Sequence, residues 1–295
     1  METVLITGSN GFIGRAIAEA LHGKYRVLGC GSSSSPLSKC DGYIQWNLGR
    51  DDPPDCLFRE APEYIVHAAA CKDTRNDSEA LFYTNCLGTY QIYRLCREIP
   101  VQKIVLISGI TVIGRPPAFP ITESLPLAPG NMYLASKATQ ELILSQLSQS
   151  ETAYVGLRVP SPVGPGQPIK TILPVFLYHA LRGEDLVLSG SGSRRQNYVD
   201  VRDIAQAVLT LLNCPDAHGL FNIGADSTIS NLELAEKCVQ LCGSQSRIVF
   251  SGLPDPFDSD VWEIDSSHLA EETGFLFRYS IEDSIRDMIS VMRSL

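Results

Sequence analysis

The sequence predicts an α/β protein in which a doubly wound parallel sheet is joined to a smaller C-terminal α/β lobe. Two observations support this fold class. Apolar runs of strand length alternate with helical stretches as far as Arg158, which is typical of a parallel sheet covered by helices on both faces. The first apolar run also ends in three glycines spaced three residues apart, Gly8, Gly11 and Gly14, directly before a helical stretch.

The first lobe is expected to span residues 1–160. Its first strand contains Val4, Leu5 and Ile6, and a helix follows Gly14. Further strands are predicted at residues 25–30, 42–46, 64–67, 103–108 and 153–158, and long helices at 77–98 and 133–149. In the second of these helices a four-residue spacing places three apolar side chains on one side: Leu134, Ala138 and Leu142.

Closely spaced prolines and glycines follow Pro160 and mark a boundary between lobes. The second lobe is predicted to span residues 161–295, with a segment near 198–225 that returns to the first lobe. Its helices are expected at residues 173–182, 203–212, 231–241 and 281–292. A short strand is expected at 186–189, before a glycine and serine turn at 190–193.

Charge and composition narrow the class of partner. The net charge of −9 over 295 residues is unclustered and argues against nucleic acid or an anionic membrane as the main partner. The chain enters a strand at once, and its longest apolar run, near residues 171–181, is too short to span a bilayer. Nine scattered cysteines without a C-x-x-C pair indicate reduced thiols and no zinc. We expect a cytoplasmic protein without a metal.

The glycine turn is typical of a dinucleotide site. Glycine has no Cβ, so backbone N–H groups can approach a pyrophosphate at the positive end of the helix. The spacing here is G-x-x-G-x-x-G rather than the commoner G-x-G-x-x-G. Taken alone, the turn also fits an ordinary glycine-rich connection between a strand and a helix.

Tyr133 and Lys137 form a second motif. Residues four apart share a helix face, so the Lys137 ammonium can lie beside the Tyr133 hydroxyl. A nearby cation lowers the pKa of a phenol toward the range of a working acid or base. Such pairs also occur on ordinary helix surfaces, and the glycine turn upstream favours the catalytic interpretation.

Taken in order, these motifs resemble the extended short-chain dehydrogenase/reductase family of nucleotide-sugar epimerases, dehydratases and reductases. The resemblance covers nearly the whole chain and rests on T-G-x-x-G-F-I-G at 7–14, H-A-A-A at 67–70, N-x-x-G-T at 85–89, Y-x-x-x-K at 133–137, Arg158 with G-P-G-Q at 164–167, and Y-V-D-V-x-D at 198–203. It implies a Rossmann-type sheet, an NAD(P) cofactor and a small-molecule substrate.

The resemblance also implies roles for individual residues. Tyr133 would exchange a proton with a substrate hydroxyl or carbonyl, Lys137 would hold the nicotinamide ribose, and His67 would be structural. The residues expected to bind the cofactor are Gly8, Asn10, Gly11, Phe12, Ile13, Gly14, Ser32, Ser33, Asn47, Leu48, Ala68, Ala69, Ala70, Asn85, Tyr133 and Lys137.

The end of the second strand bears on the form of the cofactor. An acidic side chain there would bind the ribose 2′-hydroxyl of NAD. Residues 31–35 are a glycine and four serines, with no carboxylate to repel a 2′-phosphate and several hydroxyls to bind one. We therefore expect NADP rather than NAD, although no arginine strengthens the preference, and a flexible polar loop is the other interpretation.

One departure from the family concerns the third catalytic group. Family members carry a Ser or Thr at the position of Gly109, and the nearest hydroxyls here belong to Ser108 and Thr111. Adjacent strand residues point to opposite faces, so Ser108 can substitute only if the backbone bulges. Thr111 stands where dehydratases carry an acidic residue, so we do not expect 4,6-dehydration.

A second departure concerns the substrate phosphates. The positions at which family members clamp the two phosphates correspond to Ser161, to Gln196 with Arg194 and Arg195 beside it, and to the acidic stretch at 255–260. Either Arg194 or Arg195 reaches the phosphates through a shifted loop, or the substrate is not a nucleotide sugar.

The sequence thus predicts an NAD(P)-dependent epimerase or reductase of a sugar, possibly nucleotide-linked. The alternatives are a reductase of a non-sugar carbonyl compound and a non-catalytic dinucleotide-binding protein, either a redox sensor or a scaffold. A homodimer is expected from the family, with apolar contacts from Leu81, Tyr90 and Tyr93 on one helix and Leu142 and Leu147 on the next, unless these residues face the core.

Overall fold

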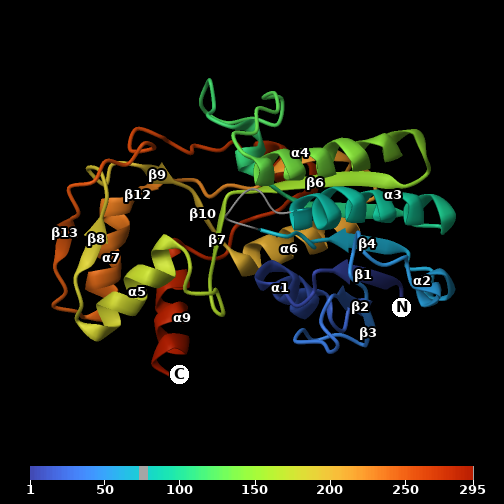
Figure 1. The fold of residues 1–295 in the computed structure, drawn as a ribbon, viewed down its shortest axis with the longest axis horizontal. Helices are drawn as coiled ribbons and strands as arrows, with labels where there is room; N and C mark the ends of the chain where they lie inside the picture. The colour runs from blue at the N-terminus through green and yellow to red at the C-terminus, as the bar shows by residue number, and fades with distance from the viewer. Residues whose placement is uncertain (73–78, 295) are drawn as a thin grey trace.

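A seven-stranded parallel sheet organises the first lobe (Figure 1). The structure is a computed structural model that describes residues 1–72 and 79–294. The strand order is β11-β6-β5-β4-β1-β2-β3. The strands are β1 (Thr3–Thr7), β2 (Arg26–Gly31), β3 (Gly42–Gln45), β4 (Tyr64–His67), β5 (Lys103–Gly109), β6 (Ala153–Val159) and β11 (Gly219–Asn222). The predicted doubly wound α/β class is confirmed.

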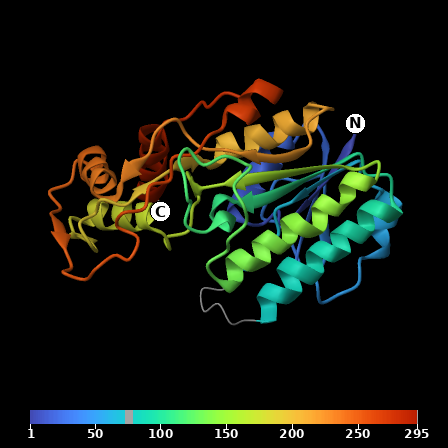
Figure 2. The same ribbon diagram turned by 90° about the horizontal axis from the view of Figure 1, so that it is seen from above.

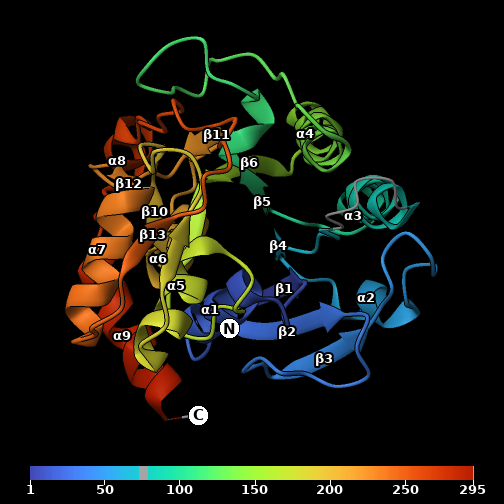
Figure 3. The same ribbon diagram turned by 60° about the vertical axis from the view of Figure 1, so that its left-hand side comes forward.

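Helices cover both faces of this sheet. On one face, α1 (Phe12–Leu21) and α6 (Val201–Asn213) pack on a core that includes Val4, Val66 and Val105. On the other face lie α3 (Gly88–Glu98), α4 (Met132–Ser145) and the short α2 (Asp55–Glu60), over a core that includes Leu5, Ile65 and Ile104. Figure 3 shows α3 and α4 end-on, with α6 on the opposite side of the sheet. The alternating apolar residues of each strand thus serve two cores.

The second lobe is built on three helices, α5 (Ile172–Arg182), α7 (Asn231–Cys242) and α9 (Ile281–Arg293), which pack around Leu177, Leu234 and Ile285. Three two-stranded ladders complete it: β7 (Ser161–Val163) with β10 (Tyr198–Asp200), β8 (Leu186–Leu188) with β13 (Ile248–Phe250), and β9 (Arg195–Gln196) with β12 (Ile229–Ser230). This lobe lies to the left in Figure 1. The chain also returns to the sheet with β11, on which α8 (Ser267–Thr273) packs.

The helix expected over residues 77–98 is partly different. Its first predicted residues, 77 and 78, lie outside the described part of the chain. Residues 81–87 form a π-helical turn, η1 (Leu81–Leu87), which leads directly into α3. Single π-helical turns are rare and frequently lie at functional sites. Here the wide turn directs Asn85 inward, where it is fully buried.

The three apolar residues that share one side of α4 differ in burial. Ala138 is buried, Leu134 is half-buried and Leu142 is 56% exposed. The other buried residues of α4 are Ser136, Lys137, Gln140, Glu141 and Leu144. Four of these five residues are polar, so an apolar pattern could not identify the whole buried face. The polar side of the helix enters the core because it meets polar partners there.

Within residues 1–72 and 79–294, no helix is long and apolar enough to cross a bilayer. The same residues contain no group of three or more His, Cys, Asp or Glu side chains that could hold a metal ion.

Candidate active site

The glycine turn lies at the carboxyl ends of β1 and β4, where the strand order reverses. Such a switch point is where ligands bind in open α/β sheets. Gly8 has a φ of +70°, and a Cβ on it would lie 2.7 Å from the Ala69 backbone. A Cβ on Gly14 would lie 2.2 Å from the Gly8 carbonyl oxygen. Only glycine fits at these two positions, so the turn brings backbone and helix terminus close together.

The N-terminus of α1 is arranged for an anion. Its N-cap is Gly11, which offers no side chain to the first backbone N–H groups of the helix. Phe12 and Ile13 are the first helical residues. Free N–H groups and the positive end of the helix dipole bind phosphate. The cradle of glycines and the uncapped helix end therefore fit the pyrophosphate of a dinucleotide.

Side chains from neighbouring segments hold the loop after β2 by hydrogen bonds to its backbone groups. The Asn10 side chain donates to the Ser35 carbonyl (3.0 Å) and accepts from the Leu37 amide (2.7 Å). Tyr43 and Gln45 donate to the carbonyls of Ser33 and Ser32. Asn10 therefore braces this loop. The side chains of Ser32 and Ser33 belong to exposed residues, beside the end of the strand.

The other residues expected to surround the cofactor lie at neighbouring strand ends. Asn47 and the buried Leu48 follow β3, in a turn that packs closely on η1, because a Cβ on Gly49 would lie 1.7 Å from the Tyr83 carbonyl oxygen. Ala68, Ala69 and Ala70 continue β4, and the Ala68 amide donates to the Thr7 carbonyl (3.1 Å). The structure thus places these residues at the carboxyl ends of the strands, on the same side of the sheet as the glycine turn.

Asn85 joins three elements. Its side chain accepts from the Cys71 amide (2.7 Å) and donates to the Cys71 carbonyl (3.0 Å) and the Ser136 hydroxyl (2.8 Å). Ser136 in turn donates to the Tyr133 carbonyl (2.7 Å). Both N–H donors of Asn85 are engaged by protein groups. Its position fixes the loop after β4 against the first turn of α4.

The pKa of Tyr133 is not lowered by Lys137 as the spacing of the two residues predicted. The Lys137 amine donates to the Ile107 carbonyl (2.7 Å) and to Gln140 Oε1 (2.5 Å). Burial lowers the pKa of Lys137 to about 8. The pKa of Tyr133 is raised, first by burial and then by the nearby Cys71 thiol. The prediction that Lys137 lowers the pKa of Tyr133 is therefore wrong for this structure, because burial raises that pKa and the Lys137 amine is directed to Ile107 and Gln140.

His67 is fully buried, as expected of a structural histidine. Its Nδ1 lies 2.7 Å from Thr7 Oγ1 and its Nε2 lies 2.8 Å from Thr89 Oγ1. Burial first, and then the charge of Lys137, lowers its pKa to about 3. The ring is therefore neutral at physiological pH, and both of its nitrogens are engaged by threonine hydroxyls.

Ser108 is not available as a catalytic hydroxyl. Strand β5 runs in regular register with β6 through Gly109, so the backbone bulge that Ser108 requires is absent. The Ser108 hydroxyl donates to Glu141 Oε1 at 2.5 Å. Arg158 forms a buried ion pair with the same carboxylate (2.9 Å). Ser108 and Arg158 thus belong to a buried polar cluster beneath α4.

Thr111 is the remaining candidate for the hydroxyl. It lies in η2 (Ile110–Ile113), a 3₁₀ turn that follows β5 and packs against α4. Thr111 is half-buried, and its Oγ1 lies 3.7 Å from the position that a Cβ on Gly109 would occupy. The Thr111 hydroxyl is therefore close to the place of the family's Ser or Thr side chain.

The predicted substrate residues separate into two groups. Arg195 is engaged within the second lobe, where it donates to Thr228 and pairs with Glu233 (3.2 Å). The Arg194 guanidinium instead lies 5.2 Å over the Phe257 ring, and its buried Nε has no hydrogen-bond partner within the described ranges. Of the two arginines, Arg194 alone has a guanidinium that the described residues do not pair.

Ser161 and Gln196 are half-buried and lie on the short strands β7 and β9 of the second lobe. Gln196 donates to the Tyr198 hydroxyl (3.2 Å) and to Asn231 Oδ1 (3.1 Å). In the acidic stretch, Asp258 accepts from Ser191 and Ser193, and Asp260 pairs with Arg115 (2.8 Å). The hydrogen bonds lower the pKa of Asp258 and keep it charged. The repulsion expected between these carboxylates and a phosphate is therefore reduced at Asp260 only.

Sequence reasoning did not identify Gln140 or Arg115. Gln140 bonds Lys137 from one turn further along α4, and its i+3 spacing from Lys137 was the available signal. Arg115 follows η2 and reaches the segment around Asp260, which is remote in sequence. A contact of this kind leaves no local pattern.

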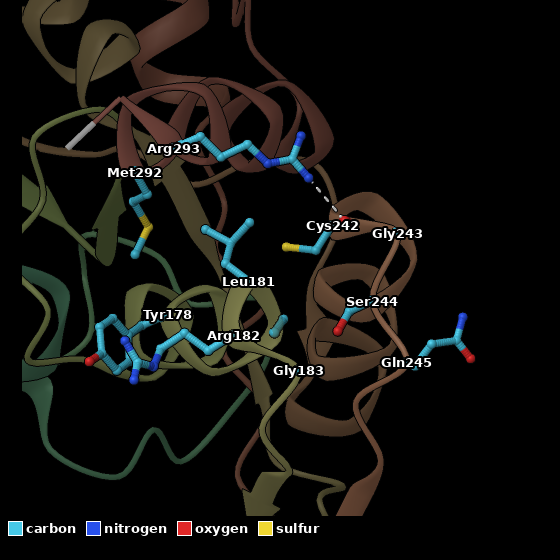
Figure 4. A pocket seen from close by; sticks show the side chains of 11 residues that line it. Tyr178, Leu181, Arg182, Gly183, Cys242, Gly243, Ser244, Gln245, Met292 and Arg293 are labelled. Carbon is cyan, nitrogen blue, oxygen red and sulfur yellow. Dashed lines mark hydrogen bonds between the residues drawn. The ribbon is translucent and has the colours of Figure 1, made fainter.

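An open pocket lies far from this site, at the outer ends of α5, α7 and α9 (Figure 4). The Arg293 guanidinium donates to the Cys242 carbonyl (3.0 Å), and Arg182 stacks on Tyr178. Arginines at the C-terminal ends of helices stabilise the negative end of the dipole. The pocket is thus a junction between helix ends.

Comparison with known proteins gives a consistent result. A family model described as the NAD dependent epimerase/dehydratase family matches residues 4–224. A dTDP-glucose 4,6-dehydratase of Streptomyces niveus is 26% identical, over 98% of this chain and 92% of that protein. The solved UDP-glucose 4-epimerase of Thermotoga maritima, with UDP-glucose, superposes with a TM-score of 0.90 at 22% identity and 99% coverage of both chains. The UDP-glucose 4-epimerase of Thermus thermophilus, in complex with NAD, gives 0.85 at 23% identity and 99% coverage of both chains.

Proposed function

The chain belongs to the NAD dependent epimerase/dehydratase family, and we propose from this premise that it is an NAD(P)-dependent epimerase or reductase of a nucleotide-linked sugar. The observation that carries the proposal is that the glycine turn and the first turn of α4, which carries Tyr133, both adjoin the loop after β4. The glycine turn follows β1, and Tyr133 and Lys137 lie on the first turns of α4, joined to the loop after β4 through Asn85 and Ser136.

The residues that would hold the dinucleotide lie near the carboxyl ends of the parallel strands. The backbone of Gly8 to Gly14 would bind the pyrophosphate, Asn47 and Leu48 would contact the adenine, and Lys137 would bind the nicotinamide ribose. When bound, the cofactor supplies the exchange of a hydride with the substrate. The protein supplies orientation and the path of the proton.

Tyr133 is the proposed acid and base. Its phenol is half-buried and its pKa is raised, so it holds its proton at physiological pH and is suited to donate that proton to a substrate carbonyl. In the opposite direction the Tyr133 phenolate that remains after this donation accepts the proton of a substrate hydroxyl. Thr111 would orient the same oxygen. Because Thr111 is neutral, we propose epimerisation or reduction rather than 4,6-dehydration.

Arg194 supports a nucleotide-linked substrate. A guanidinium that no described residue pairs is suited to a diphosphate, which it can bind through two N–H groups. Arg195 serves as a matched control because its hydrogen bonds lie within the second lobe. We expect Arg194→Gln to weaken binding of UDP at least tenfold in calorimetry, and Arg195→Gln to change it less than threefold. Equal effects, or no binding of uridine, thymidine or guanosine diphosphate by the wild type, would argue for another carbonyl substrate.

The cofactor form that we propose is NADP, with NAD as the alternative. The exposed serines at 32 and 33 could bind a 2′-phosphate, and no carboxylate follows β2 to repel one. Titration with both reduced cofactors decides between them. The proposal predicts tighter binding of NADPH, and tenfold tighter binding of NADH would reject it.

The activity itself is tested with Tyr133→Phe. Loss of a general acid and base lowers kcat by about 10²–10⁴-fold. Tyr90→Phe, on the exposed side of α3, is the control and keeps full activity. Net consumption of the cofactor during turnover identifies a reductase, and turnover without consumption identifies an epimerase. A wild-type protein that binds the dinucleotide but turns over no nucleotide sugar or simple carbonyl compound would instead support a sensor or scaffold.

A further inference from the structure

A buried chain of hydrogen bonds extends from Lys137 away from the proposed site. Lys137 Nζ contacts Gln140 Oε1 at 2.5 Å, and Gln140 Nε2 lies 2.8 Å from Thr89 Oγ1 and 3.2 Å from His67 Nε2. His67 Nδ1 continues the chain to Thr7 Oγ1 at 2.7 Å. These groups belong to α4, α3, β4 and β1. The chain therefore links four of the elements that form the site.

The chemistry of the groups fixes the direction of this chain. A lysine amine at or below its pKa is a donor, so the contact atom of Gln140 is its carbonyl oxygen and the amide nitrogen faces His67. The Thr89 hydroxyl donates to the Asn85 carbonyl (2.6 Å) and accepts from the Gln140 amide, so His67 Nε2 is the donor in its 2.8 Å contact with Thr89 Oγ1. The His67 proton is therefore on Nε2, and His67 Nδ1 accepts from Thr7 Oγ1.

The chain is suited to holding Lys137 rather than to conducting protons. Gln140, His67, Thr89 and Thr7 all have exposed fractions of 0%. His67 has a pKa of about 3 and stays neutral. A glutamine amide also has no proton that it can pass on readily. The contacts therefore fix the Lys137 amine without connecting it to solvent.

We propose that Gln140 is the positioning residue of Lys137, with Thr89, itself held by His67, keeping the Gln140 amide in the orientation that presents its oxygen to the amine. Together with the Ile107 carbonyl, Gln140 engages two of the three N–H groups of the protonated amine. The third remains for the ribose or for Tyr133. This inference depends on the role proposed above for Lys137.

The charges around Lys137 explain why a neutral partner matters. Glu141 favours the charged form of Lys137 but is shared with Arg158 and Ser108. His67 is neutral, and Tyr133 on the preceding turn of α4 is protonated. A carboxylate in place of Gln140 would neutralise the ammonium next to the ribose site. The amide holds the amine in place and leaves its charge available.

Two substitutions with opposite electrostatic effects test the proposal. Gln140→Met keeps the length of the side chain and removes the acceptor, so the charged amine loses a hydrogen bond and the pKa of Lys137 falls further. Gln140→Glu keeps an acceptor and adds a negative charge, so the pKa of Lys137 rises. Gln146→Met, at an exposed residue directly after α4, is the matched control and leaves the pKa of Lys137 unchanged.

The pKa of Lys137 is read directly by NMR titration of protein labelled with ¹³C at lysine Cε, with the resonance assigned by its loss in Lys137→Met. Turnover is measured in parallel. We expect Gln140→Met to lower kcat about tenfold or more, with KM for the sugar nucleotide within threefold, because the amine is displaced. In Gln140→Glu the pH dependence of kcat shifts toward higher pH and part of the activity returns.

The outcomes separate this inference from the proposed function. If the wild type turns over no substrate, the titration still decides, since opposite shifts in the two variants support the contact and equal or absent shifts reject it. If the wild type is active and folded Gln140→Met retains both kcat and the wild-type titration, Gln140 does not position Lys137. Thermal melting of each variant identifies any loss of folding.

Discussion

At the scale of single residues, Gly109 has room for a side chain. Its φ of −133° and ψ of 137° are ordinary extended values, and a Cβ there would meet only Thr111 Oγ1 at 3.7 Å and the Val159 carbonyl oxygen at 3.9 Å. The glycine therefore serves no steric need. Its effect is to leave the site with one hydroxyl, that of Thr111, instead of two.

We expect Gly109→Ser to fold normally and to raise kcat about tenfold, because a second hydroxyl can then hydrogen-bond the reacting oxygen. Steady-state kinetics and a thermal melt measure the two effects. Gly156→Ser is the contrasting variant, since a Cβ there would lie 2.6 Å from the Tyr154 hydroxyl, and it should melt at a lower temperature. Unchanged kcat in a folded Gly109→Ser would show that Thr111 alone is sufficient.

The lowered pKa of His67 should make the stability of the fold depend on pH in the acid range. The pKa of His67 is about 3 in the fold and about 6.5 when unfolded, so between these values the unfolded chain binds the additional proton. Stability from this group is present above pH 6.5 and is lost as the pH falls toward 3, by up to about 1.4 kcal/mol per pH unit. We expect urea unfolding of His67→Gln to show a shallower loss than the wild type between about pH 6.5 and 4. Parallel curves would contradict this.

At the scale of elements, the strands of the large sheet as far as β6 and the short β8 were predicted, whereas the short β7, β9 and β12 were not. Strands β4, β5 and β6 lie within one residue of their predicted ends, because their runs of Val, Ile and Leu are buried on both faces. The ladders made by β7, β9 and β12 have two or three residues each. Their pairing depends on partners remote in sequence, so local patterns could not predict it.

In the candidate site too, features within one element could be predicted and contacts between elements could not. The glycine turn and the pair Tyr133 and Lys137 follow from spacing within one element. The roles of Ser108 and Arg195 depend on Glu141 and Glu233, which lie on other elements. Opposite faces of a strand differ only in what covers them, and the sequence near Ser108 does not contain that information. For this reason the sequence left Ser108 and Thr111 as alternatives.

The cluster of Ser108, Glu141 and Arg158 joins β5, β6 and α4, and we expect it to be sensitive to the loss of one partner. Glu141→Leu would leave Arg158 buried without a carboxylate and lower the free energy of unfolding by about 3–5 kcal/mol. Adding Arg158→Met should restore most of it, because neither charge is then unpaired. Chemical denaturation measures both. Glu98→Ala, in an exposed pair with Arg94, should cost at most about 1 kcal/mol.

At the scale of the whole molecule, the proposed homodimer would use the outer sides of α3 and α4, which lie next to each other in Figure 2. Leu81 and Leu147 are buried in the core and are removed from the predicted interface. Tyr90 is 48% exposed and Leu142 is 56% exposed. Tyr93 is half-buried and stacks on Tyr90 with ring centroids 6.0 Å apart.

We expect Leu142→Glu to weaken self-association at least tenfold in sedimentation equilibrium, because dimerisation would bury an unpaired charge. Val187→Glu is the matched control, since Val187 is equally exposed but lies on β8 in the second lobe. A dimer that resists Leu142→Glu, or dissociates in Val187→Glu, would place the interface elsewhere. A monomeric wild type would exclude it.

The position of β11 has a consequence for how the chain folds during synthesis. The β11 strand pairs with β6, and Phe221 completes the core around Val155 and Leu157, yet more than fifty residues separate the two strands in sequence. A ribosome that has delivered β6 has therefore produced a sheet with one apolar edge still uncovered. The nascent protein must keep that edge from pairing with other chains until α6 and β11 emerge. The full sheet of the first lobe therefore forms only after residues 219–222 have been synthesised.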